Sequence, residues 1–177
     1  MTTFFTIGHS TRSIDEFIRI LRCESIGTVV DVRTIPRSRT NPQFNKDRLP
    51  AALEDFGIGY IHLPELGGLR SRQKRAETSP NSFWDNQSFR NYADYAMSEQ
   101  FRSGLRKLVE LGDTHPCAIM CAEAVWWRCH RRIIADYLLN EGQKVFHLLA
   151  PGRSEPARTT PAARQLEPHK LVYPALT

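Results

Sequence analysis

The sequence lacks any apolar run of the roughly 18 residues that a membrane span requires, which excludes a membrane-spanning helix. Cysteine is scarce: four residues in 177 are too few for a disulfide scaffold. The N-terminus lacks the basic and apolar regions of a signal peptide. We therefore expect a cytoplasmic protein without a membrane partner, whose cysteines are free thiols or ligands.

The chain also lacks an acidic excess. It holds 24 Lys and Arg against 19 Asp and Glu, which gives a net charge of +5. A basic excess favours anionic partners such as a nucleotide or nucleic acid, although a charge of this size also serves solubility alone. Hydrophobic residues make up 41% of the chain, and its length suits one domain with a buried core.

Short apolar runs alternate with helical patterns over residues 1–150. Strands are predicted at 4–7, 28–32, 60–63, 117–121 and 145–149. Helices are predicted between them, the first beginning at the capping box of Ser13 and Glu16 and the last running from Trp126 to about Glu141. This alternation predicts an α/β fold: a single three-layer domain in which a mostly parallel sheet of about five strands carries helices on both faces.

Residues 151–177 differ in composition from the rest of the chain. They hold five of the eleven prolines. Such a composition predicts an extended or disordered tail, in which the segment 171–173 is best suited to dock on the body.

Polar residues that suit chemistry follow three of the predicted strands. Because the carboxyl ends of parallel strands share one edge of the sheet, these three segments are expected to converge there. That convergence indicates a site more strongly than any single motif does. The residues at these positions are His9, Ser10, Asp31, Arg33, Cys121 and Glu123.

Five short motifs occur in order along the chain. They are Gly8-His9-Ser10, Asp31-Val32-Arg33 with Pro36 and Ser38, Leu66-Gly67-Gly68, Cys121-Ala122-Glu123 and Cys129-His130-Arg131. Together they resemble the signature of the domain-of-unknown-function 488 family, from about residue 4 to 149. The resemblance implies an α/β domain with a shared motif edge, and it implies no established reaction. Residues 151–177 lie outside it.

A weaker likeness concerns the segment that begins at Cys121. A strand that ends in cysteine before a helix resembles the rhodanese arrangement, in which backbone N–H groups surround the cysteine and an arginine closes the loop. Here Arg128 follows Cys121 by seven residues rather than six, and the loop lacks glycines that let a backbone curl around an anion. Sulfur transfer therefore stays an alternative.

Three residues are the candidate catalytic groups. Glu123 is expected as a general acid or base, although it can also serve as a helix-cap partner or pair with Arg33. Cys121, near a helix N-terminus and Arg128, is favoured as a thiolate nucleophile, and its alternative is a small buried residue. His9 can act as a base or donate to phosphate, or it can be a structural residue.

Substrate-binding residues are expected around these groups. Arginines and lysines cluster at 33–48 and again at Arg70, Arg72, Lys74 and Arg75, with aromatic residues interleaved, and this combination suits phosphate contact and base stacking. The candidate substrate-binding residues are Ser10, Asp31, Arg33, Arg37, Trp126, Arg128, His130 and Arg131.

A metal site is not predicted, and no cofactor is indicated. Cys121, Cys129, His130 and His9 are nominal ligands, but their spacing matches no common zinc pattern. The predicted helix places Cys129 in its first turns, on the face shared with Ile133, so Cys129 is expected to pack inward.

Three functions remain open at this point. The first is an enzyme that acts on a nucleotide or a nucleic-acid base through the Glu, Cys, His and Arg residues of the sheet edge. The alternatives are a non-catalytic, basic module that binds nucleic acid, and a rhodanese-like thiol or sulfur-transfer protein.

Overall fold

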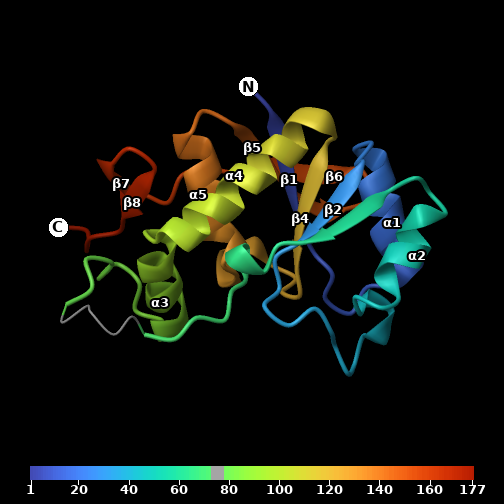
Figure 1. Cartoon of the computed structure of the whole chain (residues 1–177), viewed down its shortest axis with the longest axis horizontal. Coiled ribbons are helices and arrows are strands. Elements are labelled where there is room, and N and C mark those ends of the chain that lie inside the picture. Colours follow the sequence, from blue (N-terminus) through green and yellow to red (C-terminus); the bar gives the residue numbers. More distant parts are fainter. Residues whose placement is uncertain (73–77) are drawn as a thin grey trace.

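The computed structural model describes residues 1–72 and 78–177, and over these residues it contains a six-stranded sheet in the order β3-β2-β4-β1-β5-β6 (Figure 1). The strands are β1 (Thr3–Gly8), β2 (Thr28–Asp31), β3 (Gly59–His62), β4 (Cys117–Cys121), β5 (Lys144–Ala150) and β6 (Arg153–Pro156). The strands β1 to β5 run parallel, and β6 pairs antiparallel with β5. The predicted α/β fold is confirmed, with a sixth strand added at the edge.

The helices connect the parallel strands. They are α1 (Ile14–Cys23), α2 (Leu49–Glu54), α3 (Gln87–Ala96), α4 (Glu99–Thr114) and α5 (Arg131–Asn140), with short 3-10 turns η1 (Pro42–Phe44), η2 (Pro64–Leu66) and η3 (Trp126–Arg128). The predicted cap of α1 is confirmed, since the Glu16 amide donates to Ser13 Oγ at 3.1 Å. Lys74 and Arg75 of the basic cluster lie outside the described residues.

Two hydrophobic clusters lie on opposite faces of the sheet. One cluster joins α1 and α2 to the face that carries Phe5 and Met120. The other joins α3, α4 and α5 to the face that carries Phe4, Ile119 and Cys121. Successive residues of a strand point to opposite faces, so the wholly buried strand β4 contributes to both clusters. Figure 1 shows the resulting three layers, with α1 and α2 on one side and α3 to α5 on the other.

The strand order brings the motif segments together. The central strands β1 and β4 end side by side, with Gly8 opposite Cys121. The pairing continues beyond them, because the His9 amide donates to the Cys121 carbonyl at 2.9 Å and the Val32 amide donates to the Met120 carbonyl at 3.0 Å. The expected convergence at the carboxyl edge is therefore present.

The C-terminal segment is extended but ordered. Its first part forms β6, and β7 (Arg164–Glu167) and β8 (Lys170–Val172) form a separate hairpin. Leu171 and Tyr173 are buried, and the Tyr173 hydroxyl donates to Asp136 at 3.0 Å. The β5–β6 pairing crosses the boundary predicted at residue 150, so the disordered alternative for this tail is wrong.

The helix predicted from Trp126 begins five residues later. Trp126–Arg128 form a single 3-10 turn, Cys129 is extended with φ −133° and ψ 151°, and α5 starts at Arg131 with His130 as its N-cap. Cys129 therefore precedes the helix, although it is buried as expected. Within residues 1–72 and 78–177, no helix combines the length and apolarity needed to cross a membrane.

Candidate functional site

Glycines at three motif positions allow the segments of the site to approach closely. A Cβ at Gly8 would collide with the Glu123 carbonyl, and one at Gly67 would lie 2.9 Å from Thr34 Cα. A Cβ at Gly68 would lie 2.5 Å from His130 Nδ1. The motif at Gly8 thus packs against the motif Cys121-Ala122-Glu123, and the motif at Gly68 packs against the motif Cys129-His130-Arg131.

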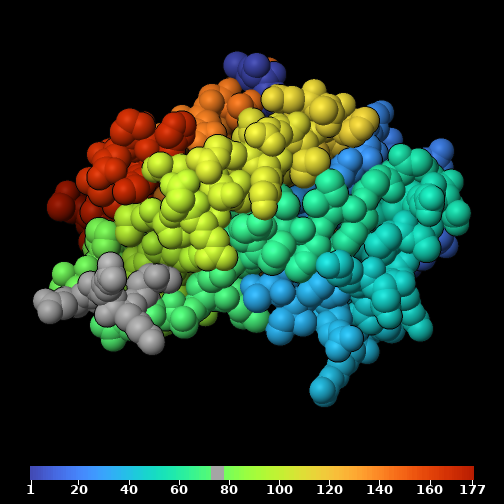
Figure 2. Space-filling view, viewed as in Figure 1, coloured from blue at the N-terminus to red at the C-terminus, as the bar shows by residue number. Residues whose placement is uncertain are grey.

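A pocket of about 320 Å³ opens at the carboxyl edge of β2 and β4. In Figure 2 the segment after β2 (blue) and the segment after β3 (green), which both contribute to it, lie side by side on the surface. Its lining residues are Arg33, Thr34, Ile35, Arg37, Gly68, Leu69, Ser88, Phe89, Tyr92, Cys121, Ala122, Glu123, Arg128, Cys129 and His130.

The pocket has an apolar part and a charged part. Ile35 and Leu69 are 57% and 68% exposed, and Phe89 stacks on Trp84 with ring centroids 4.9 Å apart. The charged residues Arg37, Glu123 and Arg128 are all exposed. The site can therefore offer apolar contact and free charges to one ligand.

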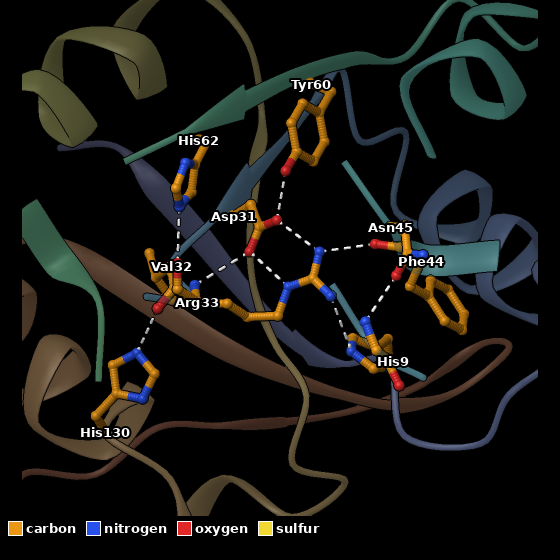
Figure 3. Close-up of polar contacts among 10 residues, drawn as sticks. His9, Asp31, Val32, Arg33, Phe44, Asn45, Tyr60, His62 and His130 are labelled. Atoms are coloured by element: carbon orange, nitrogen blue, oxygen red, sulfur yellow. Dashed lines mark hydrogen bonds and ion pairs between the residues drawn. The ribbon is translucent and has the colours of Figure 1, made fainter. Parts of the chain in front are cut away.

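Arg33 forms a buried ion pair with Asp31 (Figure 3). Arg33 Nε and Nη2 donate to the two Asp31 carboxylate oxygens at 2.9 and 2.7 Å, and Nη2 also donates to the Phe44 carbonyl at 2.7 Å. The Tyr60 hydroxyl donates to the same carboxylate. Burial lowers the pKa of Arg33, but the Asp31 carboxylate outweighs it and raises that pKa above its ordinary value.

The alternative in which Glu123 pairs with Arg33 is not realised, because Arg33 pairs with Asp31. Asp31 and Arg33 are two residues apart in an extended segment, so their side chains share a face, and the nearer carboxylate takes the guanidinium. Glu123 is exposed and has no ion-pair partner among the described residues. Its carboxylate is therefore available to a ligand.

His9 is held as a neutral ring on the other side of Arg33. Its Nε2 lies 3.3 Å from Arg33 Nη1, which can only donate, and its Nδ1 lies 2.9 Å from the Ser10 carbonyl, which can only accept. The proton therefore sits on Nδ1. Burial, aided by the charge of Arg33, lowers the pKa of His9, and the ring stacks on Phe44 at 4.5 Å.

Two further imidazoles bind backbone carbonyls of the segment that follows β2 (Figure 3). His62 Nε2 lies 2.7 Å from the Arg33 carbonyl, and His130 Nε2 lies 2.7 Å from the Val32 carbonyl. A carbonyl only accepts, so both rings donate through Nε2. In its neutral form His130 then presents an unprotonated Nδ1, which lies 3.4 Å from Cys129 Sγ.

Cys121 and Cys129 meet at the floor of the pocket, with their sulfur atoms 2.7 Å apart. Burial, the hydrogen bond to Cys129 and its charge raise the pKa of Cys121 well above its ordinary value. Burial also acts to raise the pKa of Cys129, but the contacts with Cys121 and His130 and the charge of Arg131 together lower it well below that value. Of the two cysteines, Cys129 therefore has the surroundings that favour a thiolate.

Arg131 is buried beneath this pair and is 1% exposed. Its Nη1 donates to Thr6 Oγ1 at 3.2 Å, and its Nη2 donates to the Glu123 carbonyl at 2.8 Å. Burial lowers its pKa, but the two cysteines outweigh this effect and raise it. Arg131 thus fixes the loop that carries Glu123 and supplies a charge beside Cys129.

The predicted site residues divide into two groups. Those that line the pocket are Cys121, Glu123, Arg33, Arg37, Arg128 and His130. The structure places His9, Ser10, Asp31, Trp126 and Arg131 outside the lining. Trp126 stacks on His147 of β5 at 4.4 Å and donates to Glu155 of β6 at 2.5 Å, so its ring packs against these strands rather than at the pocket.

The sequence prediction missed several lining residues, of which Cys129 matters most. It was assigned to packing because the helix was expected to begin at Trp126. Gly68 belongs to the motif Leu66-Gly67-Gly68, to which the sequence pattern assigns no role, and Phe89 is not singled out there. The signal that could have found Cys129 is the closeness of two cysteines to a histidine in the segment 121–130.

A metal centre receives no support over the described ranges 1–72 and 78–177, where no group of three or more His, Cys, Asp or Glu side chains is arranged to hold an ion.

The fold and site define an α/β domain whose motif segments enclose a pocket at the carboxyl edge of a parallel sheet. A family model described as "Domain of unknown function DUF488" matches residues 13–138. The chain belongs to this family. No curated protein and no solved structure matches the sequence.

Proposed function

We propose that the protein is an enzyme that acts on a nucleotide or a nucleic-acid base bound in the pocket. The observation that carries the proposal is the combination of apolar walls with a rim of exposed arginines and an exposed carboxylate. Ligand pockets commonly hold about 300–1,000 Å³ and combine apolar walls with a few convergent polar groups. The cavity of about 320 Å³ matches that description.

The apolar walls suit the face of a planar base. Ile35 and Leu69 are exposed aliphatic side chains beside the pocket, and a stacked base would remove them from water. Phe89 is held in place by Trp84, so it offers a fixed aromatic surface. Stacking of a base on an aromatic side chain contributes about 1–3 kcal/mol.

The rim suits a phosphate group. Arg37 and Arg128 are exposed, and in the part of the chain that the structure describes neither guanidinium has a hydrogen-bonding or ion-pair partner. Guanidinium groups bind phosphate through two parallel hydrogen bonds. Arg33 and Arg131 are committed to internal partners, so we assign phosphate contact to Arg37 and Arg128.

Glu123 is the proposed acid–base group. Its backbone is fixed by Arg131 and by the close approach of Gly8, while its carboxylate is exposed at the pocket. A positioned carboxylate can exchange a proton with the edge of a base or accept a hydrogen bond from it. General acid–base catalysis contributes about 10²–10⁴-fold to a rate.

The test is a product screen with the purified full chain. Nucleoside monophosphates, nucleosides and short single strands are incubated with the protein, and new products are detected by mass spectrometry. Glu123→Gln should lower turnover at least about 100-fold with the dissociation constant unchanged. The matched control is Glu54→Gln, which removes an equal charge from an exposed position on α2.

Two outcomes would overturn the proposal. The first is turnover that survives Glu123→Gln. The second is binding of nucleic acid without any product and with an affinity that falls steeply with salt, which would identify a non-catalytic binding module.

A further inference from the structure

We propose that Cys129 and Cys121 form a thiol–disulfide exchange site at the floor of the pocket, in which Cys129 is the nucleophile, Cys121 is the resolving thiol and the substrate is a low-molecular-weight disulfide. The inference rests on the arrangement around the two sulfur atoms. It does not require that a nucleotide binds in the pocket.

The two sulfur atoms are placed to form a bond. They are 2.7 Å apart, and the sulfur atoms of a disulfide are about 2.0 Å apart, so a small side-chain shift closes the gap. Cys121 lies at the end of β4, and Cys129 lies in the extended residue between η3 and α5. Both residues line the pocket, which gives a small disulfide a path to them.

The surroundings of Cys129 suit an attacking thiolate. The Arg131 amide at the N-terminal end of α5 donates to Cys129 Sγ at 3.4 Å, and a helix N-terminus favours a negative charge. His130 Nδ1 lies 3.4 Å from the same sulfur and can take its proton, while the Val32 carbonyl orients the ring. A nucleophile, a base and a group that orients the base form the arrangement of an activated nucleophile.

The surroundings of Cys121 suit a resolving thiol. Its Sγ lies 2.7 Å from Cys129 Sγ and donates to the Glu123 carbonyl at 3.7 Å. Burial and the neighbouring thiolate keep its pKa high. We therefore assign the attack to Cys129 and the resolving step to Cys121.

The exchange balances in two steps. The Cys129 thiolate attacks one sulfur of R–S–S–R, a Cys129–S–S–R bond forms, and R–S⁻ leaves with the electron pair of the broken S–S bond. Cys121 then loses its proton and attacks the Cys129 sulfur, and the second R–S⁻ leaves. Two protein thiols are oxidised to one disulfide, and R–S–S–R is reduced to two R–SH that take up the two thiol protons.

The other two cysteines provide internal controls. Cys117 is buried in β4 outside the pocket lining, and burial raises its pKa to about 11. Cys23 is exposed at the end of α1. We therefore expect Cys129 to exchange with a disulfide because of its surroundings, although Cys23 is the more exposed thiol.

Oxidised glutathione is the probe, and peptide mapping by mass spectrometry is the measurement. The reduced full chain should acquire a Cys121–Cys129 disulfide, and dithiothreitol should reverse it. Cys121→Ser should trap glutathione on Cys129, whereas Cys129→Ser should leave Cys121 unmodified. Cys23→Ser is the control and should form the disulfide at the wild-type rate.

Alkylation at about pH 6 provides a second measurement on the wild type, which needs no variant to fold. Cys129 should react at least about tenfold faster than Cys121, since one unit of pKa corresponds to a tenfold difference in thiolate. The titratable and charged groups that face Cys129 are Cys121, His130, Arg131, Tyr92 and His147.

Absence of the Cys121–Cys129 disulfide in the wild type, or equal alkylation of the two cysteines, would overturn the proposal. Disulfide formation without nucleotide turnover would support the exchange site and contradict the proposed function. Nucleotide turnover without disulfide formation would contradict the exchange site and support the proposed function.

Discussion

Replacing Asp31 with asparagine tests whether the buried ion pair holds the segment after β2 in place. Asp31 is fully buried and Arg33 is 6% exposed. The carboxylate accepts from the Arg33 amide, from two guanidinium nitrogens and from the Tyr60 hydroxyl. An asparagine keeps one acceptor oxygen and turns an NH₂ group toward these donors. The guanidinium then stays buried without a compensating charge.

Removing one partner of a buried ion pair costs about 3–5 kcal/mol, and we expect Asp31→Asn to lower the free energy of unfolding by that amount. Chemical denaturation followed by circular dichroism gives the value. The matched control is Glu99→Gln, which removes an equal charge from an exposed carboxylate that pairs with Arg102 and Arg106 and should cost about 1 kcal/mol or less. Equal losses in the two variants would show that the buried Asp31–Arg33 pair does not hold this segment in place.

Two further substitutions test the surroundings of the pocket. Burial and the charge of Arg131 lower the pKa of His147 to about 3, whereas an unfolded histidine titrates near pH 6.5, so unfolding takes up a proton at acidic pH. The free energy of unfolding should fall by up to about 1.4 kcal/mol per pH unit as the pH drops below about 6.5. Urea titrations at several pH values should show a smaller slope for His147→Gln and the wild-type slope for the exposed control His115→Gln. Identical slopes in the two variants would contradict a lowered pKa of His147. Gly68→Ala should displace the His130 imidazole and lower the free energy of unfolding by about 1–3 kcal/mol. Gly59→Ala is the control, because its Cβ meets nothing closer than 3.5 Å, and it should leave stability nearly unchanged. Equal effects of the two variants would count against close packing of Gly68 on His130.

Most of the fold could be predicted from the sequence because its main signals are local. The five parallel strands are apolar runs, and Ser13 caps the first helix as predicted. The strand β6 carries no apolar pattern and is mostly exposed. It forms because the unpaired backbone of the β5 edge accepts it, and Pro156 is tolerated there because it lies on an edge strand.

The site could be predicted in position but not in detail. The alternation of strands and helices in the sequence implies a parallel sheet, and a parallel sheet brings the motif segments to its carboxyl edge. The partners within that edge depend on contacts between distant segments. Arg131 is buried and donates to Thr6 of β1. Cys129, two residues earlier, is extended and lies beside Cys121. Helical periodicity contains no information on such a contact, so the sequence pattern predicts a helix that begins five residues too early.

Isothermal titration of the full chain with nucleoside monophosphates measures whether a nucleotide binds in the pocket. We expect Arg37→Ala/Arg128→Ala to bind at least about tenfold more weakly than the wild type, because it loses charge-assisted phosphate contacts worth about 1.5–3 kcal/mol each. Arg19→Ala/Arg158→Ala removes the same charge from exposed positions outside the pocket lining and should bind like the wild type. Equal affinity of the two double variants, or no binding by the wild type, would show that the pocket does not bind a nucleotide through Arg37 and Arg128.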